Sequence, residues 1–305
     1  MAKELSVSVI IPTKNRPADL ILAVTSILKQ KKAPNELIIV DQSDINESYD
    51  VVKSLFSTYR MVPKLLYVYE PGICGLVEAK QKGVSVSKCE IISFLEDDIV
   101  LHHHYIENVF ELFEKKVNIM GCCGVMSNQH SGYIYETLFA LFHRGIFFDA
   151  RLNAGKSKDC GGDGVLIPSR FLSGGISSYR RLVFDDVEFD TKNDFHMLED
   201  IDFSTRAVDF FGEDFFFIAS NMCLEHNMSE INRDRLRSRW QRKLIEYAVF
   251  YKKNSYKRSS LINFIWLLIG LFWESVASSL LKRNVGPLLG TIVGLYVGIR
   301  KKLVS

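Results

Sequence analysis

The acidic triplet Glu96, Asp97 and Asp98 is the part of the sequence best suited to bind a metal ion. It follows Ile91 to Leu95, an apolar run typical of a buried strand. Adjacent carboxylates raise one another's pKa values, so they are stable mainly with a cation among them. Mg²⁺ and Mn²⁺ take a few carboxylate oxygens together with those of a bound diphosphate. We expect Asp98 to be the metal ligand and Asp97 or Glu96 to face a ribose or a metal-bound water. The alternative is a solvated acidic turn.

A second acidic group, Glu199, Asp200 and Asp202, fits two different roles. A carboxylate can take the proton from a hydroxyl that attacks a carbon atom. Acidic residues also occur in the first turn of a helix, where they stabilise the positive end of its dipole. The residues alone favour the second role.

The histidines near the acidic triplet are weaker candidates for metal binding. His102, His103 and His104 are consecutive, and consecutive side chains point in different directions in a helix or a strand. Three in a row therefore seldom bind one ion. His226 follows the strand-like run from Phe215 to Leu224, and by itself it fits a structural histidine as well as a ligand.

Strand and helix patterns alternate in the part of the chain that carries the first acidic group. Short apolar runs predict strands, and apolar residues at helical spacing between them predict helices. The expected strands are Val7 to Ile11, Leu37 to Val40, Leu65 to Tyr69 and Ile91 to Leu95, and helices are expected from Pro17 and from Leu76. We therefore predict an α/β fold with a single Rossmann-like, mostly parallel sheet flanked by helices. Such sheets bind ligands at the carboxyl ends of their strands, where the triplet stands.

The composition is that of an ordinary folded protein. The chain has 305 residues, of which 47% are hydrophobic and 24% charged, and its formal net charge is +2. This balance predicts no nucleic-acid partner. The six cysteines include no Cys-x-x-Cys pair and no zinc-binding spacing, so we expect reduced, mostly buried thiols.

Six runs occur in the order in which family 2 glycosyltransferases carry the motifs of their A-type fold. They are SVIIPTKNR, LIIVDQS, GLVEAKQKG, FLEDD, SGGISSYRR and MLEDIDFSTR, and they span Val7 to Arg206, about two thirds of the chain. The sequence thus resembles that family. The resemblance implies an inverting enzyme that moves a sugar from a nucleotide diphosphate sugar to an acceptor hydroxyl. It also implies a divalent metal cofactor, Mn²⁺ or Mg²⁺.

The same resemblance assigns the donor site, beginning with the loop after the first strand. Pro12, Thr13, Asn15 and Arg16 resemble the loop that holds the nucleotide, and the guanidinium of Arg16 can pair with phosphate.

Two further donor contacts depart from the family pattern. Asp41 resembles the carboxylate that accepts a hydrogen bond from the base, but Gln42 stands where many relatives have a second Asp. Lys80 stands where relatives often carry Arg. It keeps the positive charge but loses the two-pronged hydrogen bonding of Arg.

On the acceptor side, Asp200 resembles the general base that receives the proton of the acceptor hydroxyl. Glu199 is expected to bind the acceptor or to orient the loop. Gly174 and Gly175 resemble the small-residue loop near the donor sugar, and His226 resembles a histidine that approaches the metal or the diphosphate. Inverting transfer needs one base and one cation, and no covalent nucleophile.

We expect residues 1–230 to form the catalytic domain and residues 231–305 to form a basic helical linker followed by a hydrophobic helical region. Leu261 to Leu281 is long enough to cross a membrane core, which takes about 20 apolar residues. Val285 to Ile299 has a glycine at every fourth position, which favours close helix packing. Basic residues flank these two runs: Lys252, Lys253, Lys257, Arg258, Arg300, Lys301 and Lys302.

This C-terminal region predicts attachment to a membrane. The N-terminus lacks the pattern of a signal peptide, so we expect a peripheral or monotopic protein on the cytoplasmic side of the cell membrane. The alternative is a buried helical hairpin that forms a homo-oligomer. The resemblance suggests surface polysaccharide or glycolipid assembly, with a saccharide or a lipid-linked saccharide as the acceptor.

Three other functions fit parts of the sequence. A sugar-1-phosphate nucleotidyltransferase would carry a glycine-rich loop after the first strand, and residues 12–16 contain no glycine. A processive polysaccharide synthase usually carries Gln-x-x-Arg-Trp. Arg239 and Trp240 are present here, but Leu236 replaces the glutamine. A catalytically silent scaffold with the same fold would have no need of the retained acidic residues.

Overall fold

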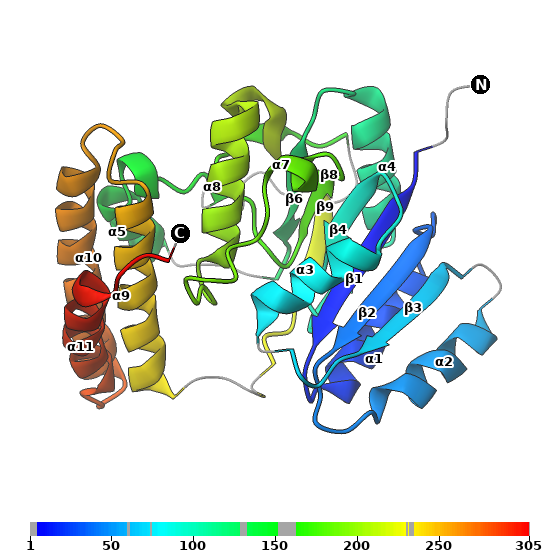
Figure 1. Ribbon diagram of the computed structural model, residues 1–305, viewed down its shortest axis with the longest axis horizontal. Coiled ribbons are helices and arrows are strands. Elements are labelled where there is room, and N and C mark those ends of the chain that lie inside the picture. Colours follow the sequence, from blue (N-terminus) through cyan, green and yellow to red (C-terminus); the bar gives the residue numbers. More distant parts are fainter. Residues whose placement is uncertain are drawn as a thin grey trace.

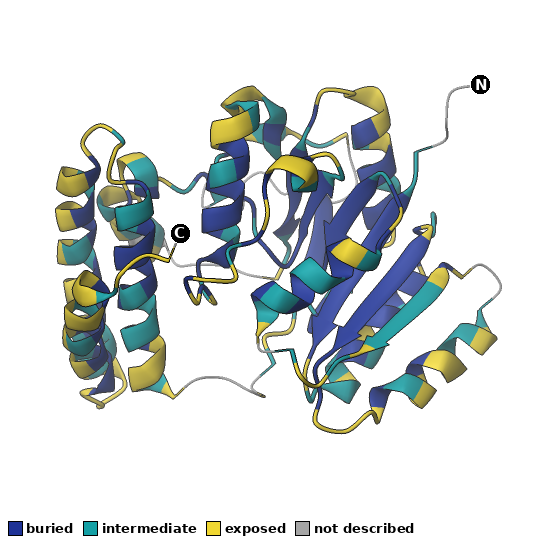
Figure 2. Ribbon diagram, in the orientation of Figure 1, coloured by how far each residue is buried: buried dark blue, intermediate teal, exposed yellow. Residues whose placement is uncertain are grey.

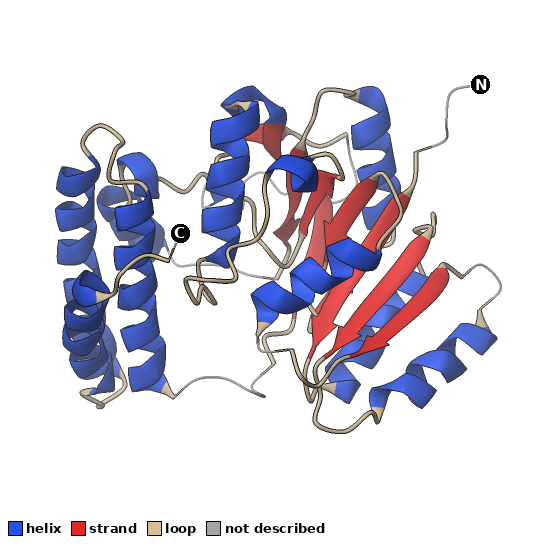
Figure 3. Cartoon of the chain, in the orientation of Figure 1, coloured by secondary structure: helices blue, strands red, loops and turns tan. Residues whose placement is uncertain are grey.

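The computed structural model describes residues 5–59, 62–73, 75–128, 133–151, 163–229, 231 and 235–304. A nine-stranded sheet lies at its centre, with helices packed around it (Figure 1, Figure 3). The strands are β1 (Val7–Thr13), β2 (Glu36–Asp41), β3 (Lys64–Tyr69), β4 (Ile91–Phe94), β5 (Ile99–Leu101), β6 (Gly121–Met126), β7 (Leu166–Pro168), β8 (Ser177–Arg180) and β9 (Phe216–His226).

The sheet has the order β3-β2-β1-β4-β8-β6-β9-β5, and β7 also pairs with β9. β3, β2, β1 and β4 are parallel to their neighbours. Strand β8 is antiparallel to both β4 and β6, and β5 and β7 are antiparallel to β9, whereas β6 and β9 are parallel. The predicted α/β class is confirmed. The strands β1, β2, β3 and β4, which the sequence predicted, form the uniformly parallel part of the sheet. The rest of the sheet is mixed.

The central strands are continuous apolar runs because both faces of the sheet are covered. Every residue of β1 and of β2 is buried (Figure 2). Helix α1 (Pro17–Leu28) has its proline in the first turn, and the other helices of this half are α2 (Ser48–Thr58), α3 (Leu76–Val86) and α4 (Tyr105–Lys115). Gly83 lets α3 approach the sheet closely, since an added Cβ would lie 2.4 Å from Ile10 Cγ2.

The part of the chain between β6 and β9 is more irregular. It contains α5 (Tyr133–Phe142), the 3-10 turn η1 (Gly145–Phe147), α7 (Val183–Asp186), α8 (Glu199–Phe211) and the 3-10 turn η2 (Glu213–Phe215). The second acidic group forms the first turn of α8. This helix stands between the sheet and the C-terminal helices (Figure 1).

Three helices make up the C-terminal region: α9 (Leu236–Lys253), α10 (Ser260–Leu281) and α11 (Gly286–Arg300). The glycine row of α11 packs against α9, not mainly against α10. A Cβ at Gly290 would lie 2.4 Å from the carbonyl oxygen of Arg237, and one at Gly294 would lie 2.4 Å from that of Gln241. The predicted close helix packing therefore occurs within the chain.

The C-terminal helices share a hydrophobic core with η1 and the start of α8. Phe171, Leu198 and Ile201 pack in one cluster with Trp240 and Leu244, separate from the main core around the sheet. The buried apolar surface therefore continues across the expected boundary at residue 230.

Several basic residues expected to face lipid pair within the protein. Lys252 Nζ lies 2.7 Å from the carbonyl oxygen of Ile299, near the end of α11. The remaining internal pairs are Lys253 with Asp190 and Asp202, Lys257 with Asp209, and Lys301 with Asp194. Arg258, Lys282, Arg283 and Lys302 are exposed.

The cysteines follow the prediction in part. Cys89, Cys122 and Cys123 are free and buried. Cys223 is disulfide-bonded, so the expectation of reduced thiols is wrong for this residue. Cys74 and Cys160 lie outside the described residues.

Candidate active site

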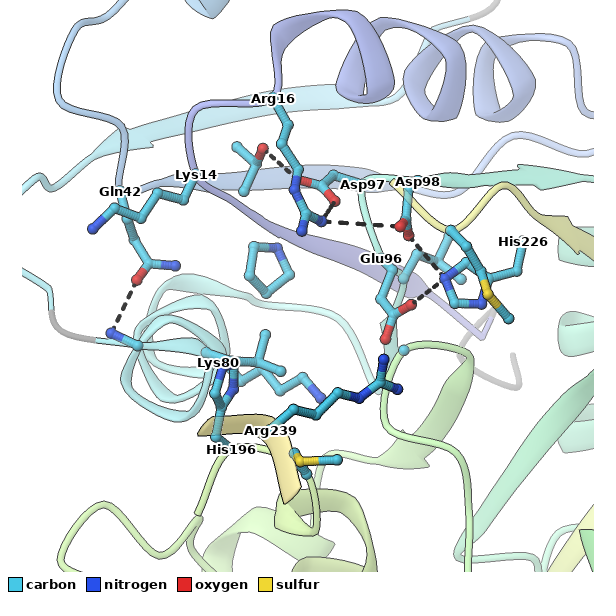
Figure 4. A pocket seen from close by; sticks show the side chains of 18 residues that line it. Lys14, Arg16, Gln42, Lys80, Glu96, Asp97, Asp98, His196, His226 and Arg239 are labelled. Carbon is cyan, nitrogen blue, oxygen red and sulfur yellow. Dashed lines mark hydrogen bonds and ion pairs between the residues drawn. The ribbon is translucent and has the colours of Figure 1, made fainter. Parts of the chain in front are cut away.

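A cavity of about 570 Å³ opens at the carboxyl ends of β1 and β4, where the fold class predicts a ligand site (Figure 4). Nine of the predicted site residues line it: Pro12, Thr13, Arg16, Lys80, Glu96, Asp97, Asp98, Gly175 and His226. The sequence runs that resemble donor-binding motifs therefore converge on one cavity.

Two predicted donor residues do not line this cavity. Asp41 is completely buried, and its carboxylate accepts hydrogen bonds from the Tyr67 hydroxyl and the Ser43 backbone N–H. The adjacent Gln42 lines the cavity instead. The side chain of Asn15 pairs with Asp44 on the outer side of the loop. These contacts hold the loops after β1 and β2, and the donor-binding roles of Asp41 and Asn15 stay predictions.

Glu96, Asp98 and His226 form the one group among the described residues that could hold a metal ion. Their ligand atoms all lie within 4.8 Å of one another. His226 Nε2 lies 3.2 Å from a carboxylate oxygen of each acidic residue (Figure 4). Two carboxylates and one imidazole suit Mn²⁺ and other borderline divalent cations. His102 and His104 instead contact Ser127 and Glu107.

The charges of this group are set by burial and by His226. Burial raises the pKa of Glu96, and the neighbouring Asp98 raises it further, while His226 opposes the shift. Burial also acts to raise the pKa of Asp98, but the hydrogen bonds from His226 and from the Ser229 backbone N–H outweigh it, so the pKa is lowered. Asp98 is thus the more strongly ionised of the two carboxylates.

Asp97 connects the triplet to the loop after β1. The Thr13 hydroxyl donates to Asp97 Oδ2 at 2.7 Å, and the Arg16 guanidinium donates to Asp97 Oδ1 at 3.0 Å. Burial raises the pKa of Asp97 to about 6, although both partners lower it. The middle carboxylate therefore holds the loop, and its neighbours on either side face His226.

Lys80 reaches from α3 to the start of α8. It is 2% exposed, and its Nζ lies 2.6 Å from Glu199 Oε1 and 2.8 Å from the carbonyl oxygen of Gly174. Burial raises the pKa of Glu199, and Lys80 opposes this shift. Lys80 is therefore both a wall of the donor cavity and the partner of the first acidic residue of α8.

Asp200 lies in an adjoining cavity of about 290 Å³. Met197 lines both cavities, so the two are neighbours. Asp200 Oδ2 accepts hydrogen bonds from Arg151 at 2.9 Å and from the Gly174 backbone N–H at 3.1 Å. A second acidic residue, Asp149, pairs with the other side of Arg151.

Gly174 and Gly175 form the contact between the two acidic groups. An added Cβ at Gly174 would lie 2.5 Å from Glu199 Oε1 and 2.7 Å from Asp200 Cβ. At Gly175 it would lie 2.3 Å from the carboxylate carbon of Glu96. Only glycine fits these positions without displacing a carboxylate, which explains the small-residue loop predicted here.

Sequence reasoning missed several residues that line the donor cavity: Lys14, Gln42, His196 and Arg239. Arg239 comes from the first turns of α9 and points into the cavity beside Glu96 (Figure 4). Its signal in the sequence was the Arg239-Trp240 pair, the part of the synthase motif that this chain has. The cavity thus has four cationic residues against three carboxylates, and a metal ion would increase its positive charge.

Arg151 and Asp149 had no recognisable signal in the sequence. They stand in the irregular segment after α5, outside every run that resembles a family motif. Their place beside Asp200 depends on the packing of η1 against α9.

The fold places the chain in the class of A-type glycosyltransferase folds. A mannosyltransferase from Pyrobaculum calidifontis, solved in complex with GDP-Man and Mn²⁺, superimposes with a TM-score of 0.58 at 12% sequence identity, covering 99% of this chain and 77% of its own. Residues 1–349 of Staphylococcus aureus TarS superimpose with a TM-score of 0.56 at 14% identity, covering 90% of this chain and 74% of that one.

The sequence profile of Glycosyl transferase family 2 matches residues 8–187, and the chain belongs to this family. It is similar to the glycosyltransferase GlyG of Streptococcus pneumoniae, with 28% identity over 110 residues, 36% of each chain. An uncharacterized glycosyltransferase of Nostoc sp. is also 28% identical over 110 residues, 36% of this chain and 33% of its own. The match spans about a third of the length of these curated relatives.

Proposed function

We propose that this protein is an inverting, metal-dependent glycosyltransferase that moves a sugar from a nucleotide diphosphate sugar to an acceptor hydroxyl. The observation that carries the proposal is the pair of adjoining cavities. One combines cationic side chains with the group Glu96, Asp98 and His226, and the other contains Asp200. Family membership and the GDP-Man and Mn²⁺ held by the Pyrobaculum enzyme support the donor class.

The donor cavity suits a diphosphate. Arg16 and Arg239 offer planar guanidinium groups that can bind phosphate oxygens through two hydrogen bonds. The group Glu96, Asp98 and His226 fits a divalent cation by its ligand types and spacing. When bound, such a cation would offset negative charge on the leaving diphosphate.

Asp200 is the proposed general base. Its carboxylate takes the proton of the acceptor hydroxyl while that oxygen forms a bond to the anomeric carbon and the bond from that carbon to the diphosphate breaks. The products are the glycoside, inverted at the anomeric carbon, and the nucleoside diphosphate. Arg151 and the Gly174 N–H fix the orientation of this carboxylate through their hydrogen bonds to Oδ2.

Three measurements test the proposal. A screen of nucleoside diphosphates with Mn²⁺ should raise the melting temperature for at least one nucleotide. With the matching donor sugar, the native protein should turn over and Asp200→Asn should lose at least about a hundredfold in rate. NMR of the product should show the opposite anomeric configuration. Equal background turnover in both proteins would favour a silent scaffold.

We also propose that the C-terminal helices attach the enzyme to a membrane surface, which suits glycolipid or surface polysaccharide assembly. Among the described residues, α10 is the one helix long and apolar enough to cross a bilayer, and 22% of its most apolar window is buried. Its exposed face carries Ile262, Ile265, Trp266, Ile269, Phe272 and Trp273. The exposed basic residues Arg258, Lys282, Arg283 and Lys302 could contact the anionic lipids of the cytoplasmic leaflet.

Flotation with vesicles tests this attachment. The full-length protein should float with vesicles that contain anionic lipid. Replacing both Trp266 and Trp273 by Ser should reduce the floating fraction severalfold. A protein that remains a soluble dimer and does not float would support the oligomerisation alternative.

A further inference from the structure

The second cavity, next to Asp200, has an aromatic wall that the donor site does not use. Its lining residues come from α5, η1, α8, α9 and the loops beside them, and from the loop after β7: Phe139, His143, Phe147, Asp149, Arg151, Phe171, Met197, Leu198, Asp200, Ile201, Lys243 and Tyr247. The rings of Phe139, Phe147, Phe171 and Tyr247 form its apolar wall, in which Phe139 is half-buried and the other three are almost completely buried. Its volume of about 290 Å³ lies at the lower end of the range for small-molecule sites.

One part of this wall is a rigid stack of rings. Phe139 and His143 are parallel, with ring centroids 3.4 Å apart, and Phe147 packs edge-on against Tyr247. His143 Nδ1 lies 3.0 Å from the carbonyl oxygen of Phe139, so Nδ1 carries the proton and Nε2 can accept from the Tyr247 hydroxyl, 3.3 Å away. Burial lowers the pKa of His143 to about 4, so the ring is neutral at physiological pH.

The cationic side chains of this cavity are all neutralised by carboxylates. Arg151 pairs with Asp149 at 2.8 Å and with Asp200 at 2.9 Å. Lys243 pairs with Glu274 at 2.9 Å. These carboxylates would repel a phosphate group bound here, because no unpaired positive charge offsets them. The cavity therefore suits an uncharged ligand with an apolar face and polar edges.

We propose that this cavity binds the terminal sugar unit of the acceptor as an uncharged pyranose ring, with the C–H face of the sugar against the Phe139 and Tyr247 side of the wall. The polar edge of the cavity is where Asp200 lies, so a hydroxyl of this sugar would be presented to the proposed base. Met197 lines both cavities, so this sugar would lie next to the donor cavity. The inference rests on the proposed function, and it specifies a neutral saccharide terminus as the group that accepts the new sugar.

Direct binding of simple sugars to the full-length protein tests the proposal. The probes are the methyl pyranosides of glucose, galactose, mannose and N-acetylglucosamine, titrated by saturation-transfer NMR, together with glucose 1-phosphate. At least one methyl glycoside should bind, and glucose 1-phosphate should bind several times more weakly than methyl glucoside. Phe139→Ala should weaken glycoside binding about fivefold, because it removes one stacking face.

Two further variants serve as a control and as a second test. Leu138→Ala, at the adjacent position of α5, removes a side chain that is 51% exposed and lies outside the cavity, so it should leave glycoside binding within a factor of two. Phe139→Leu keeps an apolar side chain at this position and removes only the flat ring, so it should weaken binding even if Phe139→Ala does not fold. Melting curves identify any variant that fails to fold.

The outcomes separate this inference from the proposed function. If a nucleoside diphosphate with Mn²⁺ stabilises the protein but no methyl glycoside binds, the acceptor inference is wrong and the donor assignment stands. It is also wrong if the glycosides bind to Phe139→Ala and Phe139→Leu as well as they bind to the native protein, or if glucose 1-phosphate binds more tightly than methyl glucoside. If neither nucleotide nor glycoside binds, both proposals fail.

Discussion

Glu246 of α9 holds the backbone that leads into Glu199 and Asp200. Its Oε2 accepts the backbone N–H groups of Met197 and Leu198, each at 2.8 Å. These N–H groups precede the first turn of α8, where no helical carbonyl is available to accept them. The helix that carries the proposed base is therefore fixed by a buried side chain from the C-terminal region.

This contact predicts a pH dependence of stability. Burial raises the pKa of Glu246 to about 7, although the backbone N–H groups of residues 196–198 and the charge of Arg242 lower it. The folded state then holds this proton more tightly than the unfolded state, whose pKa is near 4.5. The contribution of Glu246 to the free energy of unfolding should fall as pH rises from about 4.5 to about 7, and should stay low above that.

Glu246→Gln should remove this decline, since Gln keeps an acceptor oxygen and has no charge. We expect the variant to be more stable than the native protein at pH 8 by about 1 to 3 kcal/mol, and to match it more closely at pH 4.5. Urea unfolding across this pH range measures the difference. Glu111→Gln, at an exposed position of α4, is the control and should change little. A parallel pH profile for Glu246→Gln and the native protein would contradict the prediction.

The buried pair of Lys80 and Glu199 predicts strong coupling between α3 and α8. Lys80→Met leaves Glu199 without its cation, and should lower the free energy of unfolding by about 3 to 5 kcal/mol at pH 8. Lys80→Met combined with Glu199→Gln should recover most of this loss, because no isolated charge remains buried. Lys82→Met, in the same helix but at a half-exposed pair with Glu70, should cost less than about 1 kcal/mol. Additive losses in the double variant would show that the pair is not coupled.

Gly175 predicts a specific effect on the metal group. In Gly175→Ala the new methyl group would meet the Glu96 carboxylate, which must then rotate away from His226. The stabilisation by Mn²⁺ and a nucleoside diphosphate should shrink by at least half in a melting assay. Gly72→Ala is the matched control, since a Cβ there meets nothing within 4 Å. An unchanged ligand response in Gly175→Ala would mean that Glu96 does not support the metal.

The donor half of the site could be predicted from the sequence because its residues follow strands. Arg16 and Asp98 each stand a few residues beyond a buried apolar run, and parallel strands bring their carboxyl ends to one edge of the sheet. Asp41 shows the limit of this reasoning. It ends β2 at the expected place, but its side chain turns inward to Tyr67 and Ser43.

The acceptor side could not be predicted in the same way. Arg151 and Phe139 come from one irregular or helical part of the chain and Tyr247 from a distant helix, and the packing of η1 against α9 brings these parts together. The glycine row of α11 predicted a close helix contact, but not that α9 would be its partner. The spacing of residues along a helix predicts which of its faces packs closely, but it does not predict which helix packs there.

Removal of individual metal ligands provides the most direct test of the donor site. Asp98 has the lowered pKa of the group and lies 3.2 Å from His226 Nε2, so it should contribute most to cation binding. Asp98→Asn should weaken Mn²⁺ binding at least about tenfold, and His226→Gln should weaken it by a similar factor. The affinity is measured by electron paramagnetic resonance, with the nucleoside diphosphate selected in the melting screen.

Asp97→Asn is the control for this series, because Asp97 binds Thr13 and Arg16 and is not part of the group around His226. It should loosen the loop after β1, and it should weaken the binding of the nucleotide more than the binding of the cation. If Asp97→Asn reduced Mn²⁺ affinity as much as Asp98→Asn, the cation would lie between Arg16 and the triplet and His226 would be a structural residue. If all three variants bound Mn²⁺ as tightly as the native protein does, the cation would lie elsewhere in the protein.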